Sequence, residues 1–339
     1  MQHDNGLAVL SAGDLISFLE RREQEIMDVI EAAYCAHRRG NTKCPHSLFL
    51  RLPSGGSRII ALPAYIGEDV DAAGVKWISS FPSNLEAGLP RASALIVLNS
   101  VETGRAYAVM EGSIISAKRT AASAAVAAKR LVADPDALDC IGIIGCGEIN
   151  REILRFTRKT LPLITQVRVF DTNPERSRTF RTFCEDHLSL KALPARSITE
   201  VLSGGQLISI ATTAVTPHIQ TLSACPSSTV ILHISLRDIA PEALFSIDNI
   251  VDDPDHACRE NTSLDLAAKA LGHRRLIRTT IGEILTGAAP PTLGDGRTVV
   301  FSPFGLGILD LSLAIHVYRA ICSSGRICRI PGFHAEATL

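Results

Sequence analysis

The sequence predicts an α/β protein that combines a doubly wound parallel sheet with a discontinuous α+β domain. Between residues 139 and 252, apolar runs typical of strands alternate with helical segments, and this alternation is typical of a parallel sheet. Within residues 1–110, several short strand-like runs follow one another without a helix between each pair, which favours an antiparallel sheet. With 339 residues, the chain is long enough for two domains that each have a core.

Composition excludes several classes of partner. Hydrophobic residues make up 46% of the chain and the net charge is −1, so nothing indicates a nucleic acid or an anionic membrane as partner. The N-terminus lacks a basic region followed by an apolar core, and charge or proline interrupts each long apolar run, so we expect a cytoplasmic protein. The nine cysteines contain no C-x-x-C pair, which argues against a disulfide framework or a zinc site, and we expect no metal.

The first domain is expected to begin with an amphipathic helical region over residues 11–39, where apolar positions recur at helical spacing. A hairpin should follow, with strands at residues 48–52 and 58–62 and a turn at residues 53–56. Further strands are predicted at residues 74–82, 91–98 and 107–110.

A helix rich in alanine is predicted over residues 113–133, ending before Pro135. Its small residues favour close packing against a neighbour. Arg119 is a cation near the start of this otherwise apolar segment, and a buried arginine needs a carboxylate or phosphate partner.

The region from Asp139 to Asp171 has the order of a dinucleotide-binding unit: strand, glycine turn, helix, strand and acid. Gly145 would permit the tight turn, and Gly147 would let the backbone approach a pyrophosphate at the start of the following helix. Asp171 lies 24 positions after Gly147 (171 − 147), close to the spacing at which a carboxylate binds the adenosine ribose. A carboxylate there would repel a 2′-phosphate, which favours NAD over NADP. The alternative is a structural turn, because Asn150 occupies the third position of the fingerprint.

The alternation continues with helices at residues 174–187 and 198–202 and strands at residues 207–213, 230–234 and 249–252. Ligands of such sheets collect at the carboxyl ends of the strands, where Thr212 and Asp238 are expected. Thr212 could instead bond a loop, and Asp238 could be the N-cap of a helix that starts near Pro241.

Two other features have simpler interpretations. Cys146 lies in the glycine turn, where a helix N-terminus could lower the pKa of its thiol, but packing is the commoner reason for such a residue. The acids Asp252, Asp253 and Asp255 match no metal-binding loop, and we interpret them as solvated.

Near the C-terminus, an apolar helix at residues 311–321 should return to the first domain. The predicted domains are therefore residues 1–120 with 312–339, and residues 121–311.

These residues resemble the ornithine cyclodeaminase and mu-crystallin family along nearly the whole chain. The matching segments are the strand of the catalytic lysine (residues 74–79), the loop after it (88–90), the arginine that binds the substrate carboxylate (119–122), the cofactor turn (145–147) and a late glycine motif (302–310). The resemblance implies a Rossmann domain for NAD, a discontinuous domain for substrate binding and dimerisation, and a homodimer.

One branch of the family is more similar still: the dehydrogenases that act on N-(2-amino-2-carboxyethyl)-L-glutamate and supply L-2,3-diaminopropionate for siderophores and peptide antibiotics. The segments that look like this branch are residues 49–51, 58–63, 76–82, 88–94, 111–117 and 233–238. Cyclodeaminases carry a glycine-rich approach to the catalytic aspartate, whereas Ser235, Leu236 and Arg237 precede Asp238 here. The substrate of the branch has three carboxylates, and arginines bind planar carboxylates well, so a surplus of cations suits it.

The resemblance assigns roles to individual residues. The predicted catalytic residues are Lys76 and Asp238, and which of them is the base stays open. The predicted substrate-binding residues are Arg51, Arg91, Arg119 and Arg237, and the predicted cofactor-binding residues are Gly145, Cys146, Gly147, Glu148, Ile149, Asp171, Thr212, Thr213 and Ser235. An upstream synthase is a possible functional partner. Alternatives are an ornithine or lysine cyclodeaminase, an alanine dehydrogenase, a ketimine reductase, and a carrier that binds NAD(P) without catalysis.

Overall fold

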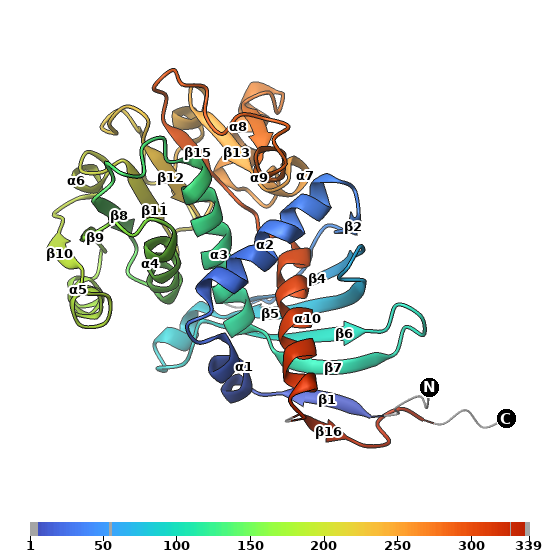
Figure 1. Cartoon of the computed structure of the whole chain (residues 1–339). Coiled ribbons are helices and arrows are strands. Elements are labelled where there is room, and N and C mark those ends of the chain that lie inside the picture. Colours follow the sequence, from blue (N-terminus) through green and yellow to red (C-terminus); the bar gives the residue numbers. More distant parts are fainter. Residues whose placement is uncertain (1–5, 54–55, 326, 336–339) are drawn as a thin grey trace. The chain divides into compact units, whose positions relative to one another are not determined.

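The computed structural model describes residues 6–53, 56–325 and 327–335 and forms two compact units (Figure 1). The first unit is Met1–Arg119 with Leu306–Leu339, and the second is Thr120–Gly305. The sequence predicts these boundaries after residues 120 and 311. Residues 54 and 55 of the predicted hairpin turn lie outside the described residues.

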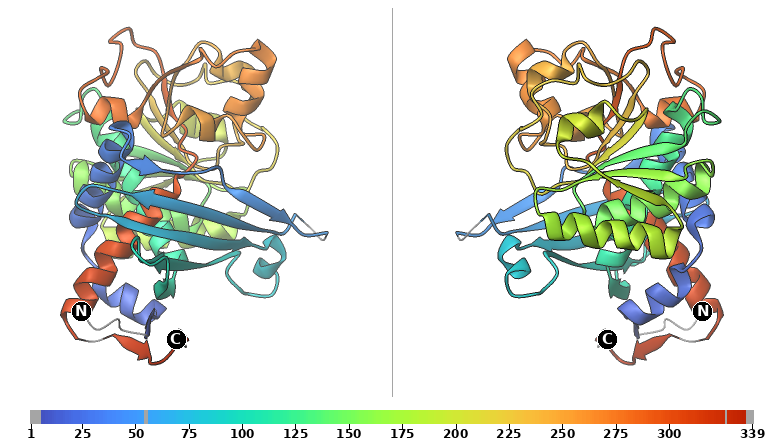
Figure 2. Two further views of the ribbon diagram at one scale, coloured as in Figure 1. Left: turned by 90° about the vertical axis from the view of Figure 1, so that its right-hand side faces the viewer. Right: turned by 90° about the vertical axis from the view of Figure 1, so that its left-hand side faces the viewer.

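A mixed sheet forms the centre of the first unit, in the order β16-β1-β7-β6-β5-β4-β2, with β3 paired to β4. Its strands are β1 (Leu7–Leu10), β2 (Thr42–Lys43), β3 (Leu48–Arg51), β4 (Arg58–Ile66), β5 (Ala72–Ser80), β6 (Ala92–Asn99), β7 (Ala106–Glu111) and β16 (Cys328–Ile330). The predicted hairpin is confirmed by the antiparallel pairing of β3 with β4. The long strands β4 and β5 lie side by side in the views of Figures 1 and 2.

The expected antiparallel pairing is confirmed for the predicted strands β3 to β7, but β1, which was not predicted, pairs parallel with β7. Strands β1 and β16 were not predicted, since runs of four and three residues carry too little alternation to be recognised. The single predicted helical region is two helices, α1 (Ala12–Leu19) and α2 (Glu23–Arg38). Arg21 between them has a positive φ of 58°, which interrupts the helix.

Helix α10 (Gly307–Ser323) packs against α2 and against strands β4 and β5. It begins four residues before the predicted start at residue 311, so that Asp310 lies in its first turn. A short 3₁₀ helix, η1 (Pro82–Leu85), connects β5 to β6. The packing of α10 on the strands therefore brings late residues of the chain against residues of the first unit's sheet.

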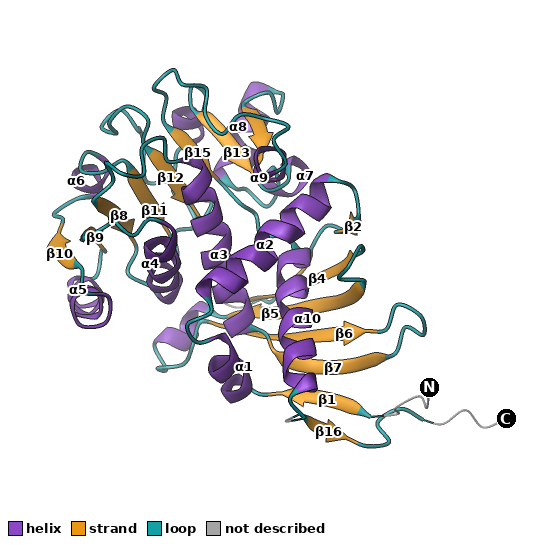
Figure 3. Cartoon of the chain, viewed as in Figure 1, coloured by secondary structure: helices purple, strands orange, loops and turns teal. Residues whose placement is uncertain are grey.

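The second unit contains the predicted parallel sheet, which is confirmed, in the order β10-β9-β8-β11-β12-β15-β13-β14 (Figure 3). Its strands are β8 (Cys140–Ile144), β9 (Gln166–Phe170), β10 (Lys191–Pro194), β11 (Leu207–Ile210), β12 (Val230–His233), β13 (Asp248–Val251), β14 (Ile277–Thr280) and β15 (Val299–Phe301). Its helices are α3 (Ser113–Leu131, which begins in the first unit), α4 (Glu148–Thr160), α5 (Pro174–Leu188), α6 (Ile198–Leu202), η2 (Pro241–Leu244), α7 (Pro254–Ala257), α8 (Ser263–Leu271) and α9 (Ile281–Leu285).

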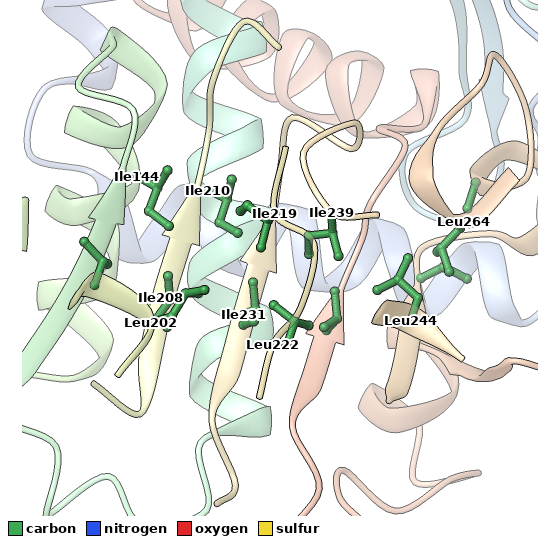
Figure 4. Packing of buried hydrophobic residues seen from close by; sticks show 14 residues of the cluster. Ile144, Leu202, Ile208, Ile210, Ile219, Leu222, Ile231, Ile239, Leu244 and Leu264 are labelled. Carbon is green, nitrogen blue, oxygen red and sulfur yellow. The ribbon is translucent and has the colours of Figure 1, made fainter. Parts of the chain in front are cut away.

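Apolar residues from neighbouring strands form the core of the second unit, as Figure 4 shows for Ile144, Ile208, Ile210 and Ile231. All residues of β11 and β12 are buried, which is typical of strands that are covered on both faces. Strand β11 ends at Ile210, earlier than predicted, so Thr212 and Thr213 lie in the loop after it. None of the described helices is long and apolar enough to cross a membrane.

Candidate functional site

The glycine turn after β8 has the backbone that the sequence predicts. Gly145 has a φ of +90°, and a Cβ atom at this position would lie 2.4 Å from the carbonyl oxygen of Ala211. Gly145 is therefore required by the fold itself. Gly147 differs, since its φ is −89° and a Cβ atom there would meet nothing within 4 Å. The open space beside Gly147 fits a group that approaches the backbone closely, as a pyrophosphate does.

Asn150 explains why the third glycine of the fingerprint is missing. Its side chain is fully buried, and Nδ2 donates to the carbonyl oxygens of Ile144 at 3.0 Å and Gly145 at 2.6 Å. Oδ1 accepts a hydrogen bond from Ser209 on the neighbouring strand at 2.7 Å. The amide thus fixes the turn to β8 and β11, a role that the motif alone does not reveal.

Asp171 lies directly beside this turn. One carboxylate oxygen accepts the N–H of Cys146 at 2.8 Å, and the other accepts the N–H of Asn173 at 2.8 Å. A carboxylate has about four acceptor positions, so others remain for ribose hydroxyls. Burial raises the pKa of the Cys146 thiol to about 12, and the charge of Asp171 adds to this effect. Cys146 is also buried, which agrees with the packing interpretation, and its predicted contact with the cofactor stays a prediction.

Backbone N–H groups at the start of α4 complete the cofactor half of the site. Gly147 is the N-cap of this helix and no side chain caps it. Within the described part of the chain, the N–H groups of Glu148 and Ile149 have no hydrogen-bond partner. Donors of this kind fit a pyrophosphate, and the residues present therefore fit a dinucleotide.

Asp238 is the centre of a buried polar cluster in the second unit. Its carboxylate accepts hydrogen bonds from the hydroxyls of Thr212 and Ser235, and Nε2 of His233 lies 3.2 Å from Oδ2. The other ring nitrogen of His233 lies 3.3 Å from the hydroxyl of Ser302. Burial alone would raise the pKa of Asp238, but the bonds from His233, Ser235 and Thr212 outweigh it and lower the pKa to about 2. Asp238 is thus a fixed anion near neutral pH.

One alternative and one expectation about acids in this unit are wrong. Asp238 is not an N-cap, because the N-cap of η2 is Ala240. Asp252 is not solvated: its carboxylate is buried and accepts the N–H groups of Phe304 at 2.9 Å and Gly305 at 2.7 Å. Asp253 caps α7. In the ranges that the structure describes, no cluster of three or more His, Cys, Asp or Glu could hold a metal ion.

The remaining predicted residues of the second unit lie in loops. Thr213 is exposed, and Thr212 also accepts the N–H of Ala214 at 3.0 Å, so it satisfies its loop as well as Asp238. Arg237 donates to the carbonyl oxygen of Glu260 at 2.8 Å. Leu236 has a φ of +67°, which suits glycine better than leucine. The chain therefore makes the turn before Asp238 without the glycine of the cyclodeaminase pattern.

The first unit brings together Lys76 and Arg119 around a residue that was not predicted as part of the site. Nζ of Lys76 lies 2.7 Å from Oδ2 of Asp310 and 3.1 Å from the hydroxyl of Ser116. Nε of Arg119 donates to Oδ1 of Asp310 at 3.0 Å, and Nη2 lies 3.4 Å from Ser116. Across the described residues, Nη1 of Arg119 has no partner. This guanidinium therefore keeps donors for a carboxylate.

The charges of this cluster shift the pKa of Lys76. Burial lowers the pKa to about 8; attraction from Asp310 opposes this effect and repulsion from Arg119 adds to it. Burial would raise the pKa of Asp310, but Arg119 and Lys76 outweigh it and lower the value. A lysine with a pKa of about 8 can exchange a proton near neutral pH.

Arg91 lies at the end of the sheet, near a second cation. Nη1 of Arg91 donates to the hydroxyl of Ser80 at 2.8 Å, and Ser80 pairs in register with Arg58. Burial and then the charge of Arg58 lower the pKa of Arg91. Arg51 pairs in register with Arg58, is exposed and stacks on Phe49 at 5.3 Å. Arg91 contacts no carboxylate among the residues described.

Sequence reasoning missed several residues of these clusters, among them Asn150, His233 and Asp310, which make the hydrogen bonds given above, and Arg58. The register of the hairpin could have revealed Arg58, because it lies opposite Arg51. The need of buried Lys76 for an anion could have indicated a carboxylate, but not which one.

The second unit has the fold of the dinucleotide-binding α/β proteins, with a glycine turn and a following acid at the ends of parallel strands. The family model "Ornithine cyclodeaminase/mu-crystallin family" matches residues 14–325, and the chain belongs to this family.

Three similar proteins are informative. N-((2S)-2-amino-2-carboxyethyl)-L-glutamate dehydrogenase of Staphylococcus aureus is 29% identical over 318 residues, which cover 91% of this chain and 94% of that protein. The structure of Thermococcus litoralis Delta(1)-pyrroline-2-carboxylate reductase with NADH and L-proline has a TM-score of 0.89 and 26% identity and covers 96% of this chain and 100% of that one. An archaeal alanine dehydrogenase dimer with bound NAD has a TM-score of 0.87 and 26% identity, with coverages of 96% and 99%.

Proposed function

We propose that this protein is an NAD-dependent dehydrogenase that oxidises the CH–NH bond of N-(2-amino-2-carboxyethyl)-L-glutamate. The products are L-2,3-diaminopropionate, 2-oxoglutarate and NADH. The observation that carries this choice is the pair of cations at the end of the sheet that also holds Lys76: Arg58 on β4, and Arg91, which bonds Ser80 at the end of β5. An alanine or ornithine substrate has one carboxylate, for which Arg119 would suffice.

The spacing of the cations also supports an extended substrate. Ser80, which binds Arg91, follows Lys76 by four positions on the same face of β5, or roughly 13 Å along the strand. Arg119 would bind one carboxylate of the substrate with its free donors. Arg58 and Arg91 would bind the carboxylates that lie farther along the extended substrate. The likeness to the dehydrogenase of Staphylococcus aureus supports the same substrate.

The proposed reaction is an oxidation to an imine followed by hydrolysis of that imine. The C–H bond of the glutamyl α-carbon breaks and the nitrogen loses its proton, giving an imine; water then adds, and the C–N bond breaks to give a keto acid and an amine. NAD supplies the hydride acceptor. Lys76, with a pKa of about 8, can accept a proton, whereas Asp238, with a pKa of about 2, is a weak base. We therefore assign proton transfer to Lys76 and a fixed negative charge to Asp238.

The cofactor is NAD. Solved relatives contain NADH or NAD, and Gly147, the N–H groups of Glu148 and Ile149, and Asp171 fit this dinucleotide. Asp171 carries a negative charge where a 2′-phosphate would have to bind, so NADP should bind less tightly.

One assay tests the proposal. The purified protein is incubated with NAD and, separately, with the aminocarboxyethyl-glutamate, L-ornithine, L-lysine and L-alanine, while absorbance of NADH and released keto acids are measured. We expect NADH and equimolar 2-oxoglutarate from the first substrate alone. NADH from alanine, or a cyclic product without net NADH from ornithine or lysine, would assign the protein to another activity of the family. Binding of NAD without turnover of any substrate would support a carrier.

We also propose a homodimer that forms through the outer face of the first unit's sheet. Leu48, Ala61, Trp77 and Leu95 form one row across β3, β4, β5 and β6 in register. Trp77 is 42% exposed and Leu95 is 51% exposed, which is unusual for a contiguous apolar row. Three further expectations stay predictions. They are pairing with an upstream enzyme that forms the C–N bond of the substrate, use of the product in siderophore or antibiotic synthesis, and a cytoplasmic location.

A further inference from the structure

The first unit contains a pocket with a volume of about 310 Å³ that none of Lys76, Arg119 and Asp310 lines. Helices α2 and α10 form its walls, and the loop between β4 and β5 (residues 67–70) forms one end. A volume of this size is at the lower end of the range for small-molecule sites.

The pocket exists because small residues of α2 face α10. Ala32, Ala33 and Ala36 lie on one face of α2, at the spacing of successive helical turns. Ser312 and Ile315 lie on the facing side of α10. Side chains this short leave a space between the helices that is apolar on most sides.

A buried hydroxyl in the lining lacks a partner. Ser312 is only 3% exposed, and its Oγ makes no hydrogen bond to any residue that the structure describes. Buried polar groups are nearly always hydrogen-bonded in folded proteins. An unsatisfied hydroxyl in the wall of a pocket therefore leaves a hydrogen-bonding position that a polar group of a ligand can fill.

Two opposite charges at the rim, Arg319 and Asp69, are exposed and have no charged partner among the described residues. Arg319 donates to the carbonyl oxygens of Val70 at 2.6 Å and Asp69 at 3.3 Å, and to no carboxylate within the described ranges. The carboxylate of Asp69 makes no hydrogen bond or ion pair with the described residues. By contrast, two carboxylates nearby have partners: Glu68 pairs with Arg39 at 2.6 Å, and Glu25 lies 2.7 Å from Nε2 of His316.

We propose that this pocket binds a free α-amino acid with an aliphatic side chain. An amino acid carries a carboxylate and an ammonium group a few bonds apart, and these match Arg319 and Asp69, which are adjacent in the structure. Its side chain would contact the alanine wall of α2, and Ser312 would bond a polar atom of the ligand. A carboxylic acid or an amine alone would match only one of the two charges.

Four probes test this match by isothermal titration calorimetry. L-leucine has both charges and an aliphatic chain, 4-methylpentanoate lacks the ammonium, 3-methylbutylamine lacks the carboxylate, and glycine lacks the chain. We expect L-leucine to bind most tightly and each of the other three to bind about tenfold more weakly or worse, since loss of about 1.4 kcal/mol is a factor of ten. Equal binding of all four probes would refute the proposal.

Variants locate the site. Arg319→Met should remove the advantage of L-leucine over 3-methylbutylamine, and Asp69→Asn should remove its advantage over 4-methylpentanoate. Ala32→Leu, which fills the pocket, should abolish binding. The matched controls are Arg275→Met and Asp186→Asn, at exposed positions of the second unit, and they should leave all affinities unchanged. Melting temperatures establish that each variant is folded.

A direct map distinguishes this pocket from the proposed active site. Photo-leucine, a diazirine analogue of L-leucine, should cross-link to peptides of α2 or α10, with excess L-leucine as competitor. The Lys76→Met variant should give the same cross-links, so the outcome does not depend on the proposed dehydrogenase activity. Cross-links confined to other peptides, or affinities that none of the pocket variants alters, would overturn the inference.

Discussion

Nζ of Lys76 lies 2.7 Å from Oδ2 of Asp310, although the two residues are 234 positions apart in the chain. Both side chains are buried, and Asp310 also accepts a hydrogen bond from Arg119 at 3.0 Å. One carboxylate therefore holds two cations of the proposed substrate site. Removal of the carboxylate and removal of one cation should have very different consequences.

The first prediction concerns this asymmetry. Asp310→Asn leaves two buried cations without an anion and should lower the free energy of unfolding by about 3–5 kcal/mol. Lys76→Met should cost about 1 kcal/mol or less, because Asp310 keeps Arg119 as its partner. Urea unfolding of both variants measures the difference. Equal losses, or a larger loss in Lys76→Met, would contradict the shared carboxylate.

The second prediction concerns pH. Because burial lowers the pKa of Lys76 to about 8, its neutral amine becomes available as a base above that pH, and kcat/KM should rise with pH, reach half its maximum near pH 8 and level off about one pH unit higher. The measurement is kcat/KM for the aminocarboxyethyl-glutamate across this range. A profile that is flat around pH 8 would exclude Lys76 as the base.

The free energy of unfolding should also depend on pH through Lys76. An unfolded lysine keeps its proton up to about pH 10, whereas folded Lys76 releases it near 8, so the unfolded chain binds more protons between these values. The penalty of burying the ammonium is therefore present below pH 8 and is relieved as pH rises. Lys76→Met should lack this relief when the two proteins are unfolded in urea at both ends of the window.

The parts that sequence predicts well are those that local patterns determine. The turn at Gly145, the parallel strands and the cation Arg119 all follow from residues close together in the chain. Short strands such as β1 and β16 were missed, and the parallel pairing of β1 with β7 was not predicted. Three or four residues carry little pattern, and the partner of a strand depends on packing of the whole sheet.

Side-chain partners that meet through tertiary packing were harder to find. Asp310 reaches Lys76 only because α10 returns to the first unit's sheet. Asn150 looked like a departure from the glycine fingerprint, yet its amide fixes the turn. Asp252 looked like part of a solvated cluster, and its burial follows from a loop that closes over it 52 positions later. Such contacts leave no periodic signal.

The third prediction concerns the length of the substrate. Arg91→Met should raise the KM for the aminocarboxyethyl-glutamate by about tenfold or more, because it removes donors for an outer carboxylate. The value of kcat should change less, since Arg91 bonds Ser80, which lies four positions after Lys76 on β5. Steady-state kinetics measure both constants. Arg275→Met, at an exposed position of the second unit, is the control. An unchanged KM would remove the main support for a tricarboxylate substrate.

The fourth prediction concerns the dimer. Leu95→Glu adds a charge to the apolar row on the outer face of the sheet and should convert a dimer into monomers. Leu163→Glu changes a similarly exposed leucine of the second unit, 49% against 51%, and should leave the dimer intact. Sedimentation velocity distinguishes the species. Dissociation by both variants, or by neither, would place the interface elsewhere.

The fifth prediction separates folding from cofactor binding with two neighbouring glycines. Gly145→Ala introduces a Cβ atom 2.4 Å from a backbone oxygen at a positive φ, so stability should fall by about 1–3 kcal/mol. Gly147→Ala meets nothing within 4 Å and has an ordinary φ of −89°, so stability should change by less than about 0.5 kcal/mol.

If a pyrophosphate approaches the backbone at Gly147, however, the added methyl group occupies its place, and Gly147→Ala should weaken NADH binding by about tenfold or more. Urea unfolding and fluorescence titration with NADH measure the two properties on the same samples. Wild-type affinity for NADH in Gly147→Ala would mean that the open space beside this residue is not where the dinucleotide binds. Loss of stability in the same variant would mean that the fold, and not the cofactor, requires the glycine.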